Sequence, residues 1–279
     1  MPIHGQEETG GDGVSSSARL RILGIDVYYD GYKALSNVEF EACPGEFIAL
    51  LGPNGSGKTT LLKTIARVLK PRKGVIYIDS RKADELNDNE YAKIIGFLPP
   101  SDTSVIIRVP IKGVEVVAIG RKPHVTWSLT KADLEKIWSA MRIARVDVFA
   151  FRDVNELSSG ERQRVMLARV LAQEPEVLLL DEPVSHLDPR YQVFMLKLIR
   201  SLTKDRKLVT IASLHDINLA LRFSDKVILM KNGRVFAMGT PEEVITAENI
   251  SEVYGVKAVV IRNPHPVVLI EDVIEDEPP

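Results

Sequence analysis

Three short runs of this sequence contain residue types that bind and split phosphate esters. Residues 52–59, GPNGSGKT, are rich in glycine and end in a lysine and a hydroxyl residue. Residues 177–180 are apolar, and Asp181 and Glu182 follow them at once. Residues 157–164, LSSGERQR, are typical of the start of a helix, whose free N–H groups suit an anion. We therefore expect one chain to carry two half-sites, which a second copy of the chain completes.

The glycine-rich run has the phosphate-loop pattern. Its glycines allow the backbone to fold closely around phosphate oxygens, Lys58 adds a positive charge at the β and γ phosphates, and Thr59 offers a hydroxyl to Mg²⁺. A strand is predicted at Phe47–Leu51 and a helix from the loop to about Leu69, which is the context that the motif requires. A simple glycine turn is the alternative interpretation. The predicted nucleotide-binding residues of this run are Gly52, Pro53, Asn54, Gly55, Ser56, Gly57, Lys58, Thr59 and Thr60.

The apolar run at Val177–Leu180 predicts a buried strand that delivers two acids to the carboxyl end of a sheet, where α/β folds bind their ligands. Asp181 would join Thr59 in holding Mg²⁺, and Glu182 would orient and polarise the attacking water. In isolation, two acids after a strand could equally be a structural cap. The phosphate loop upstream favours the catalytic interpretation.

The surrounding sequence predicts an α/β fold that positions these runs. Strands are predicted at 20–28, 38–41, 75–78, 208–212 and 227–230, and helices near 89–93, from Pro189 and from Asp216. Residues 105–155 are predicted to be mainly helical, and one face of an amphipathic helix at 130–143 is formed by Leu134, Ile137, Trp138 and Met141. The sum is a parallel-sheet core that carries a helical insertion.

Composition is consistent with a single well-filled domain. With 45% hydrophobic residues, 279 residues can bury a sizeable core, and a net charge of -2 provides no basic field for nucleic acid. The single cysteine, Cys43, excludes an internal disulfide. No run reaches the roughly 18 apolar residues that a membrane helix needs. If the protein acts at a membrane, we therefore expect it to bind another protein there.

Taken together, the motifs resemble those of the ATP-binding subunit of an ABC transporter, from about Tyr29 to the end of the chain. The resemblance implies a P-loop NTPase core with a parallel sheet, an N-terminal antiparallel β subdomain and a helical insertion. Residues 1–18, rich in Gly, Ser and acids, are expected to be a disordered leader. Residues 19–279 would form one nucleotide-binding domain, with a helical subdomain at about 105–155 and a C-terminal extension at about 240–279.

The same resemblance assigns three further roles. His215 matches the family's switch histidine and would contact the γ phosphate, although a lone histidine after a strand is more often structural. Ser185 and Asp188 match the loop through which two subunits sense each other, and alone they could be a helix cap before Pro189. Tyr29, by its spacing to Leu35, is expected at the adenine in preference to Tyr28, and the alternative is that either tyrosine simply packs on the sheet.

The run Ser158, Ser159, Gly160 and Glu161 matches the family's LSGGQ signature, with the second serine and the glutamate as departures. The hydroxyl of Ser158 and the N–H of Gly160 would bind the γ phosphate of an ATP held by the partner chain. The structural alternative is that Ser158 is a helix N-cap and forms a capping box with Glu161, and both interpretations can hold at once.

A departure from the family concerns the segment after residues 95–99. The family places a glutamine there, which meets Mg²⁺ and the attacking water. This chain has Pro100, which lacks a side-chain hydrogen-bonding group, and Ser101 or Asp102 is the candidate substitute.

The nearest resemblance is to importers of metal chelates, meaning siderophores, haem and cobalamin. It rests on the string GRKPH at 120–124 and on the long run 214–244. It implies a homodimeric ATPase with ATP and Mg²⁺ as cofactors and Lys58, Glu182 and His215 as catalytic residues.

In that interpretation the chain drives import through a separate permease, is supplied indirectly by a substrate-binding protein and does not bind nucleic acid. It would lie at the cytoplasmic face of the cell membrane as a peripheral subunit. The alternatives are a soluble ABC-type ATPase that acts as an assembly or mechanical module, and a P-loop kinase. A kinase would leave LSSGE and His215 unexplained.

Overall fold

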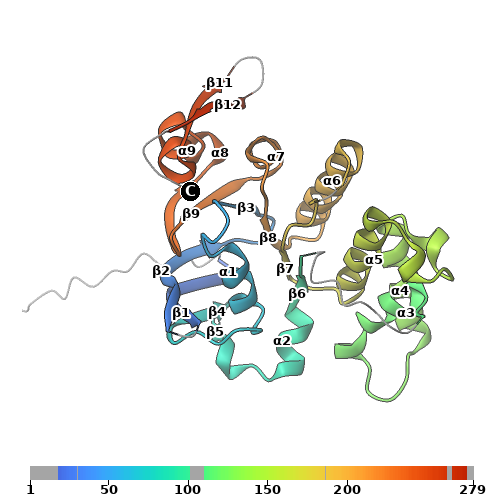
Figure 1. The fold of residues 1–279 in the computed structure, drawn as a ribbon. Helices are drawn as coiled ribbons and strands as arrows, with labels where there is room; N and C mark the ends of the chain where they lie inside the picture. Colours follow the sequence, from blue (N-terminus) through green and yellow to red (C-terminus); the bar gives the residue numbers. More distant parts are fainter. Residues whose placement is uncertain (1–17, 30, 101–109, 186, 263–265, 275–279) are drawn as a thin grey trace, which may run out of the picture.

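The fold was determined as a computed structural model, which describes residues 18–29, 31–100, 110–185, 187–262 and 266–274 (Figure 1). Ser101, Asp102 and nearly all of the predicted leader lie outside the described residues. The described strands form three sheets, and the largest carries two of the three chemical runs, the phosphate loop after β3 (Phe47–Leu51) and the acids after β7 (Val177–Leu180). Among the described residues, no helix is both long enough and apolar enough to cross a bilayer.

The largest sheet has six strands in the order β10-β9-β3-β8-β7-β6. These are β3 (Phe47–Leu51), β6 (Ile95–Leu98), β7 (Val177–Leu180), β8 (Val209–Ser213), β9 (Lys226–Lys231) and β10 (Arg234–Gly239). All neighbours are parallel except β10, which runs antiparallel to β9. Every residue of β3 and β7 is buried, as expected for parallel strands covered on both faces. Because β3, β8 and β7 are adjacent, the segments that follow them meet at one carboxyl edge.

A four-stranded antiparallel sheet confirms the predicted N-terminal β region. It consists of β1 (Leu20–Tyr29), β2 (Tyr32–Ala42), β4 (Lys73–Ile78) and β5 (Arg81–Lys82) in the order β2-β1-β4-β5. Strand β2 begins six residues before the predicted strand, because it extends to the tip of the β1–β2 hairpin, where Tyr29 pairs with Tyr32. One buried cluster joins this sheet to α1 (Lys58–Ile65) and to one face of β3.

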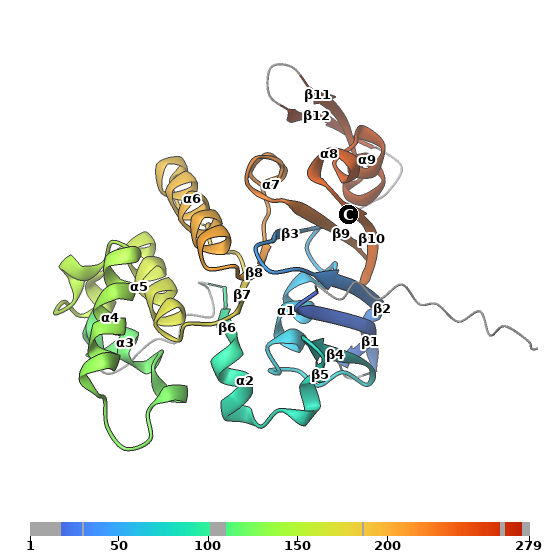
Figure 2. The same ribbon diagram turned by 180° about the vertical axis from the view of Figure 1, so that it is seen from behind.

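Helices α3 (Gly113–Ile119), α4 (Lys131–Ile143) and α5 (Ser159–Ala172) lie together beside the six-stranded sheet (Figures 1 and 2). Three short 3₁₀ helices separate them, η3 (Lys122–His124), η4 (Asp147–Phe149) and η5 (Val154–Glu156). Ile137 and Met141 of the predicted apolar face are buried, whereas Leu134 of the same face is 46% exposed. Helix α4 packs through residues 137, 140 and 141 instead, so the buried face is narrower than the apolar face.

Three of the remaining helices, α2 (Asp88–Ile94), α6 (Pro189–Asp205) and α7 (Ile217–Phe223), begin within one residue of their predicted starts. The others are η1 (Ala83–Glu85), α8 (Pro241–Val244) and α9 (Ala247–Tyr254), and the chain then forms a hairpin of β11 (Val256–Ile261) and β12 (Val267–Val273). Helix α1 ends four residues earlier than predicted, and Arg67 adopts a left-handed φ of 57° just after it. That conformation cannot continue a right-handed helix.

Candidate active site

The phosphate loop leaves β3 through glycines in conformations that other residues rarely adopt. Gly52 has φ 146°, and a Cβ there would lie 2.4 Å from the carbonyl oxygen of Met230. Gly57 has φ 102° and is the N-cap of α1, which has no side-chain cap. The N–H groups at the start of α1 are therefore available to an anion, as in phosphate-binding loops.

The ammonium group of Lys58 lies inside this loop. Its Nζ donates hydrogen bonds to the carbonyl oxygens of Gly52, at 2.6 Å, and Pro53, at 2.9 Å. Burial lowers the pKa of Lys58, and the nearby carboxylates of Glu182 and Asp181 oppose that shift. The positive charge of Lys58 is thus held by the loop that would surround a phosphate, and it lies near the carboxylates of Asp181 and Glu182.

A cavity of about 260 Å³ brings several predicted site residues together. Its lining comprises Tyr29, Tyr32, Ala34, Asn54, Gly55, Gly57, Lys58, Thr59, Thr60 and Glu182. Tyr28 does not line it, and Arg72 and Lys33 lie over its ring instead, 5.0 and 5.8 Å from the centroid. Tyr32 was not among the predicted residues. A hairpin with Gly31 at its tip was the available signal, since it places residues 29 and 32 opposite each other.

Asp181 is fully buried at the end of β7. Its Oδ1 accepts a hydrogen bond from the hydroxyl of Ser213 at 2.6 Å, and the same hydroxyl oxygen accepts the N–H of Glu182 at 2.8 Å. Asp181 Oδ2 is buried and has no hydrogen-bond partner among the described residues. Ser213 thereby ties β7 to β8 beneath the site, a role that the sequence did not indicate.

Glu182 adopts a φ of 51°, which is uncommon for a residue with a side chain and is characteristic of strained positions at functional sites. Its Oε1 lies 2.7 Å from Nε2 of His215, which follows β8. The hydroxyl of Ser185 donates to the carbonyl oxygen of Glu182 at 3.0 Å, and Asp188 accepts N–H groups at the start of α6. The structural interpretation of Asp188 as a helix cap therefore holds.

Ser158 is the N-cap of α5 and forms the predicted capping box with Glu161. The N–H and the hydroxyl of Ser158 both lie 2.9 Å from Oε2 of Glu161. Hydrogen bonds from the backbone N–H of Ser158, and then from its hydroxyl, lower the pKa of Glu161. None of the four signature residues lines the 260 Å³ cavity, and α5 lies well away from α1 (Figure 1). The chain does not bring its own signature to its own phosphate loop.

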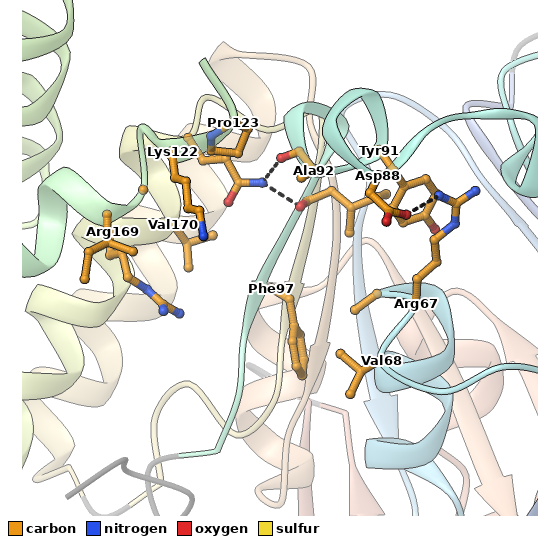
Figure 3. Close-up of a pocket in the computed structure, with 15 residues that line it drawn as sticks. Arg67, Val68, Asp88, Tyr91, Ala92, Phe97, Lys122, Pro123, Arg169 and Val170 are labelled. Carbon is orange, nitrogen blue, oxygen red and sulfur yellow. Dashed lines mark hydrogen bonds and ion pairs between the residues drawn. The ribbon is translucent and has the colours of Figure 1, made fainter. Parts of the chain in front are cut away.

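A second cavity, of about 520 Å³, separates the core from the helical region (Figure 3). From the core side it is lined by Arg67, Tyr91 and Phe97, and from the helical side by Lys122 and Arg169, among others. In Figure 3, Lys122 and Arg169 lie on one side of the cavity and Arg67 on the other, with Phe97 and Val68 between them. The side-chain amide of Gln173, at the end of α5, donates to the carbonyl oxygen of Ile95 at 2.7 Å and to that of Ala92, joining the two sides.

The string GRKPH forms part of the frame of this region. The Arg121 guanidinium is buried, and it contacts Asp133 and Glu174 at 3.0 Å each. His124 Nε2 lies 2.8 Å from the carbonyl oxygen of Gln173. These contacts fix the end of α5 against α4, so the string is explained by packing of the helical region.

Comparisons with known proteins agree with this geometry. Residues 35–185 match the family described as ABC transporter. The ferric enterobactin transport ATP-binding protein FepC of Escherichia coli (strain K12) is 36% identical over 253 residues, which cover 89% of this chain and 92% of FepC. The hemin import ATP-binding protein HmuV of Pseudomonas aeruginosa is 39% identical over 258 residues, 90% of this chain and 99% of HmuV.

The dimeric structure of the ATP-binding cassette MJ0796, in a post-hydrolysis state bound to ADP and Pi, has the same fold. It aligns with a TM-score of 0.71 and 29% identity, covering 80% of this chain and 98% of MJ0796. The family match and the identity to FepC and HmuV lead to one conclusion: the chain belongs to the ABC transporter family and is one of its ATP-binding ATPase subunits.

Proposed function

We propose that the chain binds Mg-ATP in the 260 Å³ cavity and hydrolyses it with the residues that converge there. The observation that carries the proposal is that the phosphate loop, Glu182 and the hairpin tyrosines line one cavity. Tyr29 takes the adenine ring by stacking, and Tyr32 flanks it. Loop residues 52–60 hold the phosphates, with Lys58 turning from the loop carbonyls to the β and γ phosphates.

A magnesium ion fits the acidic side of this cavity. Asp181 presents a buried oxygen without a hydrogen-bond partner among the described residues, and Thr59 brings a hydroxyl to the cavity wall. Hard oxygen ligands of this kind, completed by phosphate oxygens and water, are what Mg²⁺ takes at nucleotide sites. The ion, when bound, neutralises charge on the phosphates, and Asp181 and Thr59 hold it.

Glu182 and His215 form the hydrolytic pair of the proposal. Glu182 lies on the cavity wall, where its carboxylate accepts a proton from the attacking water. The imidazole of His215, 2.7 Å away, orients that carboxylate and reaches the γ phosphate. Ser185, which holds the carbonyl of Glu182, keeps the backbone of this turn in place.

The signature serves a second copy of the chain. Ser158, Ser159 and Gly160 begin α5 outside the chain's own cavity, and an ATP presented by a partner would meet the Ser158 hydroxyl and the Gly160 N–H there. The dimeric MJ0796 structure supports this arrangement. A two-fold dimer then contains two equivalent composite sites, with Asp188 of each chain at the junction.

Residues 19–279 act in this proposal as one nucleotide-binding domain at the cytoplasmic face of a membrane. The 520 Å³ cavity accepts a short segment of a separate permease. Its charged lining is Arg67, Lys122 and Arg169 against Asp88, so an apolar segment with an acidic residue suits it. The named transport roles of FepC and HmuV favour a metal chelate as cargo, delivered by a substrate-binding protein, over a soluble mechanical ATPase.

Reconstitution tests this function in two stages. The purified chain should hydrolyse Mg-ATP, and in vesicles with its permease the rate should rise when a substrate-binding protein loaded with ferric siderophore, haem or cobalamin is added. A chain without any ATPase activity would contradict the catalytic assignment. An ATPase rate that responds to none of the three chelates would contradict the proposal that the cargo is a metal chelate, and it would leave the ATPase assignment intact.

A further inference from the structure

The last helix of the chain contacts the phosphate loop. Tyr254 ends α9, and its hydroxyl oxygen lies 2.9 Å from the backbone nitrogen of Gly52, whose N–H it accepts. The two residues are 202 positions apart in the sequence. Burial raises the pKa of Tyr254 to about 12, so the phenol stays neutral near pH 7 and adds no negative charge beside the phosphates.

Gly52 is the residue at which β3 becomes the loop. Its backbone is held from both sides, because the N–H donates to Tyr254 while the carbonyl oxygen accepts from Lys58 Nζ at 2.6 Å. Its φ of 146° and the close approach of Met230 leave no room for a side chain. The tyrosine therefore acts on the same peptide group that receives the loop's only lysine.

Helix α9 and the hairpin that follows it are each attached to the core. Lys231, at the end of β9, contacts the side chain of Glu252 at 2.6 Å. The side chain of Asn218 forms two hydrogen bonds with the backbone of Val268 in β12, donating to its carbonyl at 3.1 Å and accepting its N–H at 2.7 Å. Figure 1 shows α9 and the β11–β12 hairpin above β9, with α8 between α9 and α7. Tyr254 is thus presented from a segment that is tied to β9 and α7.

We propose that Tyr254 is a positioning residue for ATP, which holds Gly52 so that the backbone of the phosphate loop is preorganised for the nucleotide. The inference rests on the proposed function, which makes this loop the phosphate site. Without the hydroxyl, the loop also populates conformations that do not bind ATP. The apparent affinity for ATP then falls in proportion to the fraction of molecules whose loop is in the binding conformation. The effect belongs to binding, because Tyr254 does not line the cavity where Glu182 acts.

The substitution Tyr254→Phe removes the hydroxyl and keeps the buried ring. The KM for ATP, and the dissociation constant of Mg-ATP measured calorimetrically in a Glu182→Gln background, should rise by roughly three- to tenfold, the range expected for one hydrogen bond. The kcat should stay within about twofold of wild type, because no group at the reacting phosphate is changed.

Thr203→Val is the matched control. It removes a buried hydroxyl that contacts the carbonyl of Ile199 and Thr210 Oγ1 in the core, away from the loop. It should lower the melting temperature without raising the KM for ATP. A Tyr254→Phe protein whose KM stays within twofold of wild type overturns the proposal, whatever its melting temperature.

The variant Lys58→Ala distinguishes a failure of the Tyr254 proposal from a failure of the proposed phosphate site. If Lys58→Ala loses ATP binding while Tyr254→Phe binds normally, the phosphate site stands and the positioning role fails. If Lys58→Ala binds ATP normally, the phosphate site itself is wrong, and the inference about Tyr254 fails with it.

Discussion

Nε2 of His215 lies 2.7 Å from Oε1 of Glu182, although the two residues follow different strands. Strands β7 and β8 are adjacent and parallel, so the residues beyond their carboxyl ends are brought together. Glu182 is held there by its left-handed backbone and by the N–H that it donates to Ser213. The contact restricts the carboxylate to orientations that face the imidazole.

Replacing the imidazole should reduce turnover more than binding. We expect His215→Ala to lower kcat by roughly 10²-fold, because Glu182 loses the group that orients it, and to change the KM for ATP little. Steady-state ATPase assays over a range of ATP concentrations measure both constants. A variant with wild-type kcat would show that the 2.7 Å contact is not used in hydrolysis.

Removing the loop lysine should affect both binding and chemistry. Lys58→Ala deletes a preorganised charge, which typically costs about 3 kcal/mol or more of transition-state stabilisation. Hydrolysis should fall below detection in a phosphate-release assay, and ATP binding should weaken. Lys63→Ala, on the same helix but outside the cavity lining, is the control and should hydrolyse ATP like the wild type. Normal turnover by Lys58→Ala would rule out its assigned role.

The sequence predicted the elements that carry the site where the local pattern alone determines them. Strands β3 and β7 begin and end at the predicted residues, because their unbroken apolar runs are bounded by turn or acidic residues. Asn87 and Thr240 each form a capping box with the glutamate three positions further on, which is again a local relationship. Asn232 and Gly233, an adjacent Asn-Gly pair of the kind typical of a tight hairpin turn, both have positive φ.

Contacts between distant residues could not be predicted in the same way. Periodicity indicates which side chains are buried but not which of them meet, so Ser213 beneath Asp181 and Tyr254 beside Gly52 had no local signal. The exposure of Leu134 could not be predicted for a related reason: an apolar face can be wider than the neighbour that covers it. The structure places the predicted loop, Tyr29 and Glu182 at one cavity, and their roles stay predictions.

The stability of the helical region should depend on pH through Asp133. Hydrogen bonds from the hydroxyl and then the N–H of Thr130, and the contact with Arg121, lower the pKa of Asp133 to about 2. An unfolded aspartate has a pKa of about 3.9, so the ionised group stabilises the fold above about pH 5, and this contribution is lost as the pH falls toward 2. Urea unfolding at several pH values measures it.

Asp133→Asn should therefore be less stable than wild type at pH 7, and the difference should shrink as the pH falls toward 3. The control is Asp147→Asn, an exposed acid of the same region, which should give a small difference at every pH. A difference between Asp133→Asn and wild type that is constant from pH 7 to pH 3 would show that ionisation of this carboxylate does not contribute.

Pro100 stands two residues beyond Leu98, whose carbonyl oxygen accepts the N–H of Asp181 at 2.9 Å. The segment after β6 therefore starts beside the acidic edge of the site. We expect Pro100→Gln to raise the basal ATPase rate and to reduce the Mg²⁺ concentration needed, because it supplies an amide where charge develops. ATPase assays across a magnesium titration test this. A slower enzyme would mean that the fixed φ of proline matters more than the missing amide.

Nucleotide-dependent dimerisation tests two separate roles, water attack by Glu182 and binding of the partner's ATP by Ser158. Glu182→Gln should retain ATP, because the carboxylate serves water attack, and it should accumulate as a dimer in Mg-ATP. Adding Ser158→Arg should abolish that dimer, since a bulky side chain would occupy the position of the partner's phosphate at the exposed start of α5. Size-exclusion chromatography with and without Mg-ATP distinguishes the two proteins.

Adding Glu156→Arg to Glu182→Gln instead, at an exposed position in η5, is the matched control and should leave the dimer intact. A Glu182→Gln protein that stays monomeric in saturating ATP, or a Ser158→Arg double mutant that still dimerises, would contradict the composite site.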